Sequence, residues 1–107
     1  MKHRVVIRAS AYDDLLHIID YLAERSPAAA LRFRAACLQL ADSLPDMPYR
    51  GPAEPADPSS RLRRVIVPAF DRYLMYYFVF EEKIVIIRIL HTSRDLPAEL
   101  EQSDDIS

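Results

Sequence analysis

The segment from 72 to 80 constrains the fold more than any other feature, because it has apolar or aromatic side chains on both faces of a predicted β-strand. Alternate side chains of a strand point to opposite sides of its sheet. The two sets are Tyr73, Met75, Tyr77 and Val79 on one side, and Leu74, Tyr76, Phe78 and Phe80 on the other. A half-solvated sheet with one polar face is therefore excluded for this strand, and both faces need a cover.

The strand predicted over 84–91 has the same character. Its alternate sets are Val85, Ile87 and Ile89, and Ile84, Ile86, Arg88 and Leu90. Two helices are expected before these strands, and they cover only one side of so small a sheet. The second side is covered either by the proline-rich or C-terminal segment of this chain, or by another protein. That protein is a second copy or a dedicated inhibitor.

The N-terminal half predicts two amphipathic helices. Ser10 is the expected N-cap of a helix over about 11–24, and Ser26 with Pro27 starts a second helix over about 27–44. The apolar stripes are Leu15, Ile18, Ile19 and Leu22 in the first helix, and Phe33, Cys37, Leu40, Ala41 and Leu44 in the second. The short break between them predicts an antiparallel hairpin.

The remaining segments complete a β-α-α-β-β-β order. A short run at 4–8, flanked by arginines, is a candidate edge strand, and a strand over 62–67 ends at Pro68. Five of the eight prolines interrupt the loop 45–60. A final helical turn is expected at 97–100, capped by Ser93 or Asp95, and an acidic C-terminal tail covers about 98–107. We therefore predict one α+β domain over 1–107, with a helical hairpin on a mostly antiparallel sheet whose last three strands form a meander.

The composition argues against a disulfide, a metal site and a phosphate-binding loop. One cysteine, Cys37, allows no internal disulfide, and no signal peptide or membrane span is apparent, so we expect a soluble cytoplasmic protein. His3, His17 and His91 stand apart in the sequence, so no metal site is expected. Because the chain has a single glycine, a glycine-rich phosphate loop is excluded and no cofactor is expected.

Cations are concentrated in the C-terminal half. Residues 61–94 contain seven lysines and arginines against three acids, whereas 95–107 contains five acids and no base. The arginines of this region are Arg61, Arg63, Arg64, Arg72, Arg88 and Arg94. They are typical of a solvated sheet edge, of phosphate binding beside tyrosines, or of contact with an acidic protein partner.

The sequence resembles the ParE/RelE toxins of type II toxin–antitoxin systems over essentially its whole length. The segment AYDDLLHIIDYLAERSPAAALRF at 11–33 is similar to their helical hairpin, and FDRYLMYYFVFEEKIVIIRILHTSRDL at 70–96 is similar to their last two strands. The resemblance implies an antitoxin whose C-terminal part wraps the toxin. We expect this antitoxin to bind Leu74, Tyr76, Phe78, Phe80, Ile84, Ile86 and Arg88.

The resemblance leaves two activities open. The RelE branch cleaves messenger RNA on the ribosome with sheet arginines and lysines and a C-terminal tyrosine, whereas the ParE branch poisons DNA gyrase. Here Leu74 stands where the nuclease branch has an arginine, Leu100 stands near the position of the C-terminal tyrosine, and no tyrosine follows Tyr77. A metal-free nuclease needs placed cations and a proton donor. These differences favour a non-enzymatic gyrase inhibitor that causes growth arrest and serves plasmid or chromosome maintenance.

The expected residues depend on the activity. For the gyrase inhibitor, the target-binding residues are Arg61, Arg63, Arg64, Arg72 and Arg94. For a ribosome-dependent endoribonuclease they are the phosphate clamps Arg64, Arg88 and Arg94. A third reading is a degenerate toxin that keeps only antitoxin binding and operon regulation. Operator DNA is contacted only through the antitoxin, and a homodimer or a heterotetramer with the antitoxin is possible.

Overall fold

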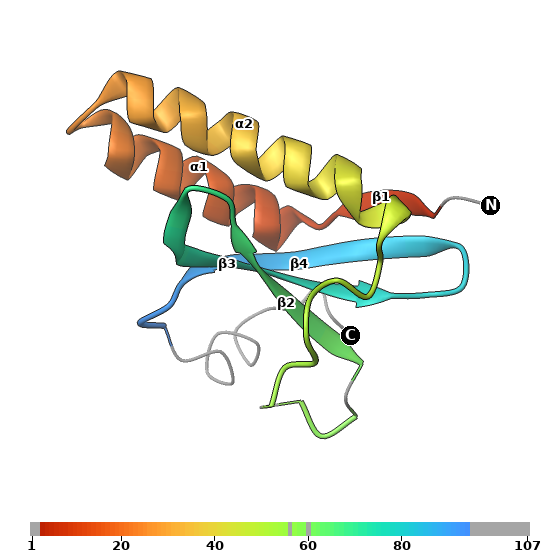
Figure 1. Cartoon of the computed structure of the whole chain (residues 1–107). Coiled ribbons are helices and arrows are strands. Elements are labelled where there is room, and N and C mark those ends of the chain that lie inside the picture. Colours follow the sequence, from red (N-terminus) through yellow and green to blue (C-terminus); the bar gives the residue numbers. More distant parts are fainter. Residues whose placement is uncertain (1–2, 56, 60, 95–107) are drawn as a thin grey trace.

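The structure is a computed structural model that describes residues 3–55, 57–59 and 61–94. The elements in chain order are β1 (Arg4–Ile7), α1 (Ala9–Ala23), α2 (Pro27–Ser43), the short 3₁₀ helix η1 (Leu44–Asp46), β2 (Leu62–Val67), β3 (Phe70–Val79) and β4 (Lys83–His91). Figure 1 shows both helices lying together across one face of the sheet. Among the described helices, none has the length and apolarity needed to span a membrane.

The sheet has the strand order β1-β4-β3-β2. The predicted antiparallel meander is confirmed, because β2 pairs with β3 and β3 with β4 in antiparallel fashion. β1 is an edge strand, as expected, but it pairs with β4 in parallel, so the sheet is mixed. β4 is therefore an inner strand, and its side chains are buried on both faces, Ile84 and Ile86 in one apolar cluster and Val85 and Ile87 in another.

The start of α1 differs from the prediction. The helix begins at Ala9, its N-cap residue is Arg8, and no side chain caps it. Ser10 is therefore not the cap; its Oγ donates instead to the carbonyl oxygen of Ile87 at 2.6 Å, which ties the first turn to β4. The cap of α2 is confirmed, because the backbone N–H of Ala29 donates to Ser26 Oγ at 3.1 Å.

The main core lies between the helices and the sheet. The predicted stripes of both helices enter it, with Phe33 and Leu44 fully buried. β3 contributes Met75 and Tyr77, and Tyr73 packs at the margin with its ring edge-on to Phe33, at 5.1 Å between centroids. The alternation predicted for β3 is therefore correct, and the set containing Tyr77 faces the helices.

A second apolar cluster lies on the sheet face away from the helices. Its buried members are Leu62, Tyr76, Val85, Ile87 and Leu90, with Val6, Leu74 and Phe78 packed against them. The expectation that Ile84 and Ile86 share this face is wrong, because both are fully buried in the core under the helices. A register shift between Tyr76 and Tyr77 places an extra residue in β4, so the alternation changes phase near Arg88.

The proline-rich loop runs along the free edge of β2. Its regular structure is limited, within the described residues, to η1 and a single bridge between Ala53 and Arg63. The N–H of Arg64 donates to the carbonyl of Pro52 at 3.1 Å, and that of Glu54 donates to the carbonyl of Leu62 at 2.8 Å. The loop therefore provides hydrogen-bond partners for part of the free edge of β2. The turn predicted at 97–100, its cap Asp95 and the acidic tail lie outside the described residues.

Candidate functional site

Arg64 lies on the sheet face away from the helices and is engaged by a carboxylate. It stands opposite Tyr76 in the β2–β3 ladder, and its Nη1 is 3.4 Å from Oε2 of Glu54. Glu54 is the one charged residue buried among those described, at 7% exposure. Arg64, whose side chain is 38% exposed, is thus ion-paired with a carboxylate that the proline-rich loop brings to the sheet.

Arg88 lies on the opposite side and forms a two-pronged ion pair with Asp14 of α1. Its Nε donates to Asp14 Oδ2 at 2.7 Å and its second terminal nitrogen donates to Oδ1 at 2.8 Å. Asp14 Oδ2 also accepts the backbone N–H of Ile89 at 2.9 Å. Both side chains are nearly buried, at 11% and 12% exposure. This geometry fits a structural clamp between α1 and the irregular part of β4.

The other predicted arginines do not gather in one place. Arg63 donates from Nη1 to the carbonyl of Gly51 at 2.7 Å and stacks over Tyr49. Arg61 lies beside Phe78, Arg72 is an exposed residue of β3, and Arg94 borders a hollow between α1 and the end of β4. The sheet therefore separates the cations that appear clustered in the sequence.

The face predicted to bind a partner is less open than expected. Tyr76 is only 5% exposed, Leu74 and Phe78 are half-buried, and Phe80 is 43% exposed. A shallow hollow of about 150 Å³ remains between Phe78, Phe80, Val85 and Ile87, with Arg8 and Arg61 at its border. Sequence reasoning missed Arg8 as a site residue, although its position after the first strand was a usable signal.

The buried tyrosines of the sheet are poor candidates for proton donors. Burial raises the pKa of Tyr76, the Glu54 carboxylate raises it further, and Arg64 opposes the change. Burial also raises the pKa of Tyr77, whose hydroxyl accepts the N–H of Gly51 at 3.1 Å. His91 Nδ1 accepts the backbone N–H of Ser93 at 3.1 Å, as expected for a hydrogen-bonded histidine at a strand end. Phenols with raised pKa values release protons less readily than free tyrosine.

No set of three or more histidine, cysteine, aspartate or glutamate side chains is grouped for metal binding in the described part of the chain. Cys37 is a buried free thiol on α2, and burial raises its pKa to about 12. The thiol therefore stays protonated at neutral pH and packs as a small apolar group.

Comparisons with known proteins identify a toxin family and a similar fold. Residues 5–96 match the family described as ParE toxin of type II toxin-antitoxin system, parDE. The chain is 37% identical over 92 residues to Toxin RelE2 of Caulobacter vibrioides, an alignment that covers 85% of this chain and 97% of that protein. Its fold is similar to a chain of a solved structure described as "Chromosomal ParDE TA system from P. aeruginosa", with a TM-score of 0.69 and 21% identity over 84% of this chain and 96% of that one.

Proposed function

The chain belongs to the ParE family of toxins of type II toxin–antitoxin systems, and from this premise we propose that it arrests growth by poisoning DNA gyrase in the cytoplasm. In this proposal the protein is a non-enzymatic inhibitor. It stalls gyrase on cleaved DNA, and a cognate antitoxin holds it inactive until the antitoxin is lost.

The ion pairs of the sheet arginines are the observation that favours gyrase over messenger RNA as the target. A metal-free ribonuclease needs several cations that converge on one phosphate, together with a proton donor. Arg64 and Arg88 lie on opposite faces of the sheet and are paired with Glu54 and Asp14. Recruiting either arginine to a phosphate means breaking an ion pair, and moving Arg88 exposes a nearly buried carboxylate.

The residues around the arginines support the same choice. Leu74, at the position where the nuclease branch has an arginine, packs against the apolar cluster of the outer sheet face. Tyr76 is the tyrosine nearest to Arg64 in the ladder, and its pKa is raised above that of free tyrosine. Leu74 therefore supplies no second cation beside Arg64, and Tyr76 is a weaker proton donor than free tyrosine.

We propose that the antitoxin covers the outer sheet face at its exposed end. Phe80 and the half-buried Phe78 line the hollow there, and Arg8 and Arg61 supply positive charge at its border. An antitoxin segment that has an apolar side chain with neighbouring carboxylates matches that lining. In this proposal the antitoxin contacts Phe78 and Phe80 of the predicted set, and Leu74 is half-buried beside them. Tyr76, Ile84 and Ile86 are buried, and Arg88 is held by Asp14.

Purified protein tests the activity directly. Incubation with gyrase, ATP and supercoiled plasmid is expected to accumulate cleaved plasmid, and the same protein is expected to leave ribosome-bound message intact. The reverse pair of results, intact plasmid and cut message, would show that the gyrase assignment is wrong.

A ribosome-dependent endoribonuclease is the second candidate, because the relative with 37% identity carries the name RelE2. In that case Arg94, which borders the hollow beside His91 and Tyr73, is the candidate phosphate-binding cation. Arg94→Ala would then abolish message cleavage without changing the thermal melting curve. Unchanged cleavage would remove Arg94 from that mechanism.

A further inference from the structure

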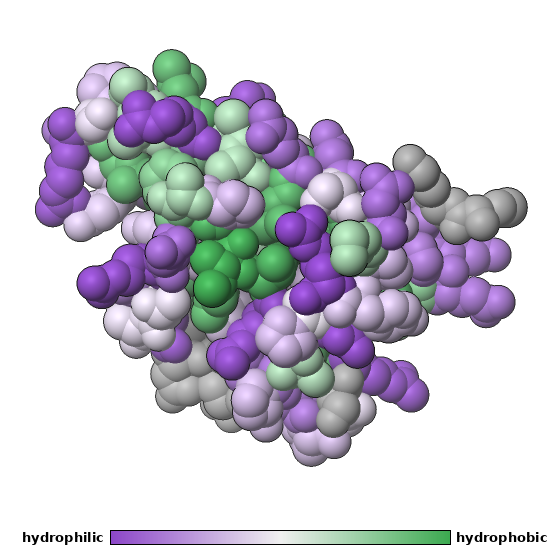
Figure 2. All heavy atoms as spheres, in the orientation of Figure 1, coloured by the Kyte–Doolittle hydropathy of each residue, from purple (hydrophilic) through white to green (hydrophobic). Residues whose placement is uncertain are grey.

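Gly51 fixes the start of the proline-rich loop on the helix side of the sheet. Its N–H donates to the Tyr77 hydroxyl at 3.1 Å, and its carbonyl oxygen accepts Arg63 Nη1 at 2.7 Å. Arg63 stands opposite Tyr77 in the β2–β3 ladder, and Tyr77 belongs to the core under the helices. In Figure 2, hydrophilic residues border the apolar middle of the molecule on the side of this loop. The two residues before Gly51, Tyr49 and Arg50, are therefore held close to Arg63.

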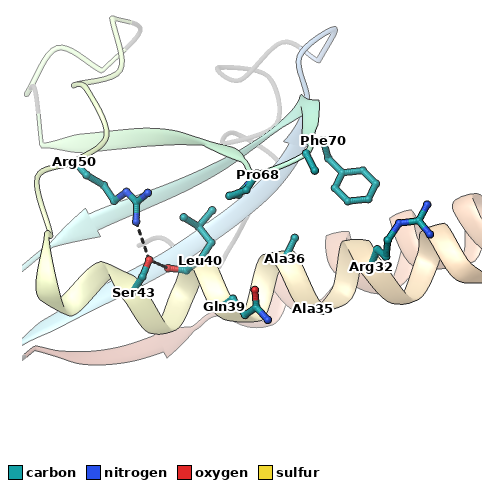
Figure 3. Close-up of a pocket in the computed structure, with 10 residues that line it drawn as sticks. Arg32, Ala35, Ala36, Gln39, Leu40, Ser43, Arg50, Pro68 and Phe70 are labelled. Carbon is teal, nitrogen blue, oxygen red and sulfur yellow. Dashed lines mark hydrogen bonds between the residues drawn. The ribbon is translucent and has the colours of Figure 1, made fainter.

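Two guanidinium groups lie at this point, and each is held by a hydrogen bond. Arg50 Nη1 donates to Ser43 Oγ at 2.9 Å, as Figure 3 shows, and Arg63 is held by the carbonyl of Gly51. Both cations act on one hydroxyl, because burial raises the pKa of Tyr77 whereas the Gly51 N–H, Arg63 and Arg50 each lower it. Side chains that are fixed in advance lose little freedom on binding, so the pair is prepared for an anion.

Neither guanidinium is paired with a carboxylate in the described part of the chain. The two ion pairs of the sheet involve Arg64 and Arg88 instead. Arg50 is exposed and Arg63 is half-buried, and the groove next to Arg50 adds Arg32 to its lining but no acidic residue. The local charge is therefore positive, which favours an anionic ligand.

Tyr49 adds an aromatic surface beside the two cations. The guanidinium carbon of Arg63 lies over one face of the Tyr49 ring, 4.8 Å from the ring centre. The Tyr49 side chain is nevertheless 64% exposed, so the other face of the ring is open to solvent. An exposed ring next to fixed arginines is the combination on which unpaired bases stack while their phosphates are bound.

We propose that Tyr49, Arg50 and Arg63 bind single-stranded nucleic acid. The two guanidiniums donate hydrogen bonds to the oxygens of one phosphodiester, and the neighbouring base stacks on the open face of Tyr49. Duplex DNA fits this site less well, because its paired bases stack on each other and do not reach the ring. None of the three residues lines the hollow of the outer sheet face or the hollow at Arg94. The site is therefore separate from those proposed above for the antitoxin and for message cleavage.

The identity of the strand rests on the proposed function. DNA that gyrase holds cleaved presents unpaired nucleotides at its ends, and a toxin that binds them opposes resealing of the break. Messenger RNA is the other source of unpaired nucleotides. The binding site itself does not depend on this choice, so it is tested first without gyrase.

Fluorescence anisotropy with the purified chain tests base stacking. The probes are a fluorescein-labelled oligothymidylate of about ten nucleotides and an abasic strand of the same length. The unchanged protein is expected to bind the oligothymidylate about tenfold more tightly than the abasic strand. This difference should vanish in Tyr49→Ala and persist in Tyr12→Ala, the matched control at an exposed tyrosine of α1. Equal binding of the two strands by the unchanged protein would overturn the proposal.

The salt dependence of binding tests the arginines. Arg50→Gln is expected to weaken oligothymidylate binding about fivefold at low salt, and to reduce the slope of log affinity against log salt by about 0.7. Arg34→Gln, at an exposed arginine of α2, removes the same charge away from the site and should change both quantities much less. An equal loss in the two variants would overturn the site, because net charge would then explain the attraction. Circular dichroism melting curves check that each variant is folded.

Plasmid cleavage by gyrase identifies the strand. Tyr49→Ala is expected to lower the yield of linear plasmid about tenfold relative to Tyr12→Ala. Equal yields, together with tighter binding of an RNA strand than of the DNA strand, would overturn the assignment to DNA. Oligothymidylate binding without plasmid cleavage supports the site and contradicts the gyrase proposal. Plasmid cleavage without oligothymidylate binding overturns the site and leaves the gyrase proposal standing.

Discussion

Replacing Asp14 with alanine is expected to be among the most damaging single changes in the protein. Asp14 accepts three hydrogen bonds, two from the guanidinium of Arg88 and one from the N–H of Ile89. The variant leaves the guanidinium at 11% exposure without its carboxylate. Removing one partner of a buried pair costs about 3–5 kcal/mol, and the slight exposure of this pair places the expected loss near 3 kcal/mol.

Urea unfolding at 25 °C measures this loss. With a slope of about 1.5 kcal/mol per molar urea, typical of a small domain, the transition midpoint should fall by about 2 M. Asp13→Ala is the matched control, because Asp13 is an exposed neighbour on the same helix. That change should alter the free energy of unfolding by no more than about 0.5 kcal/mol.

A double variant separates the ion pair from simple truncation. Asp14→Leu with Arg88→Met removes both charges and keeps apolar volume, so it should recover most of the stability lost in Asp14→Ala. A loss below about 1 kcal/mol in Asp14→Ala would refute the clamp, since exposed ion pairs have that magnitude. Arg88 would then be available as a phosphate ligand, as a nuclease requires.

Three other changes probe separate parts of the fold. In Gly51→Ala the new Cβ overlaps the carbonyl of Arg64 and comes within 2.9 Å of the Tyr77 hydroxyl, so the loop must move away from β2. Urea unfolding should show that the free energy of unfolding falls by about 2 kcal/mol. An unchanged free energy of unfolding would mean that the loop does not pack against β2 at this point. Ala69 has a φ of 69° in the β2–β3 turn, so Ala69→Gly should stabilise the protein by about 0.5 kcal/mol, whereas destabilisation would contradict the left-handed turn. The pKa of Cys37 is raised to about 12 in the folded protein, whereas the thiol of the unfolded chain loses its proton near pH 8.5. The free energy of unfolding should therefore fall as pH rises above about 9. In Cys37→Ala the urea midpoint should fall less between pH 8 and 10 than it does in the unchanged protein.

Local patterns predicted the elements well. The stripes of both helices, the Ser26 cap and the alternation of β3 depend on periodicity within one segment, and each is present in the structure. The meander was also predictable, because short connections join β2, β3 and β4 in antiparallel order.

Features that depend on pairing between distant segments were not predictable. The irregularity in β4 moves Ile84 and Ile86 to the helix side and aims Arg88 at Asp14, and no local signal marks it. The parallel pairing of β1 likewise joins residues far apart in the sequence. Arg64 appeared as part of a cationic cluster because its partner Glu54 belongs to a loop whose path the prolines obscure.

A groove of about 550 Å³ between α2 and the β2–β3 turn, lined by Leu40, Pro68 and Phe70 among others, also depends on contacts between distant segments. Arg32 and Arg50 belong to a helix and a loop, and only the fold places them at the two ends of one apolar surface. In the sequence each is an ordinary solvated arginine.

Plasmid cleavage by gyrase is the most direct measurement of whether this toxin acts on DNA topology. Purified gyrase with supercoiled plasmid and ATP, quenched with detergent and protease, should yield linear plasmid in proportion to the added protein. The Asp14→Ala variant, once unfolded by warming, should yield none. If the folded protein produces no linear DNA at any concentration while translation extracts lose intact message, the gyrase account is contradicted and the nuclease reading replaces it.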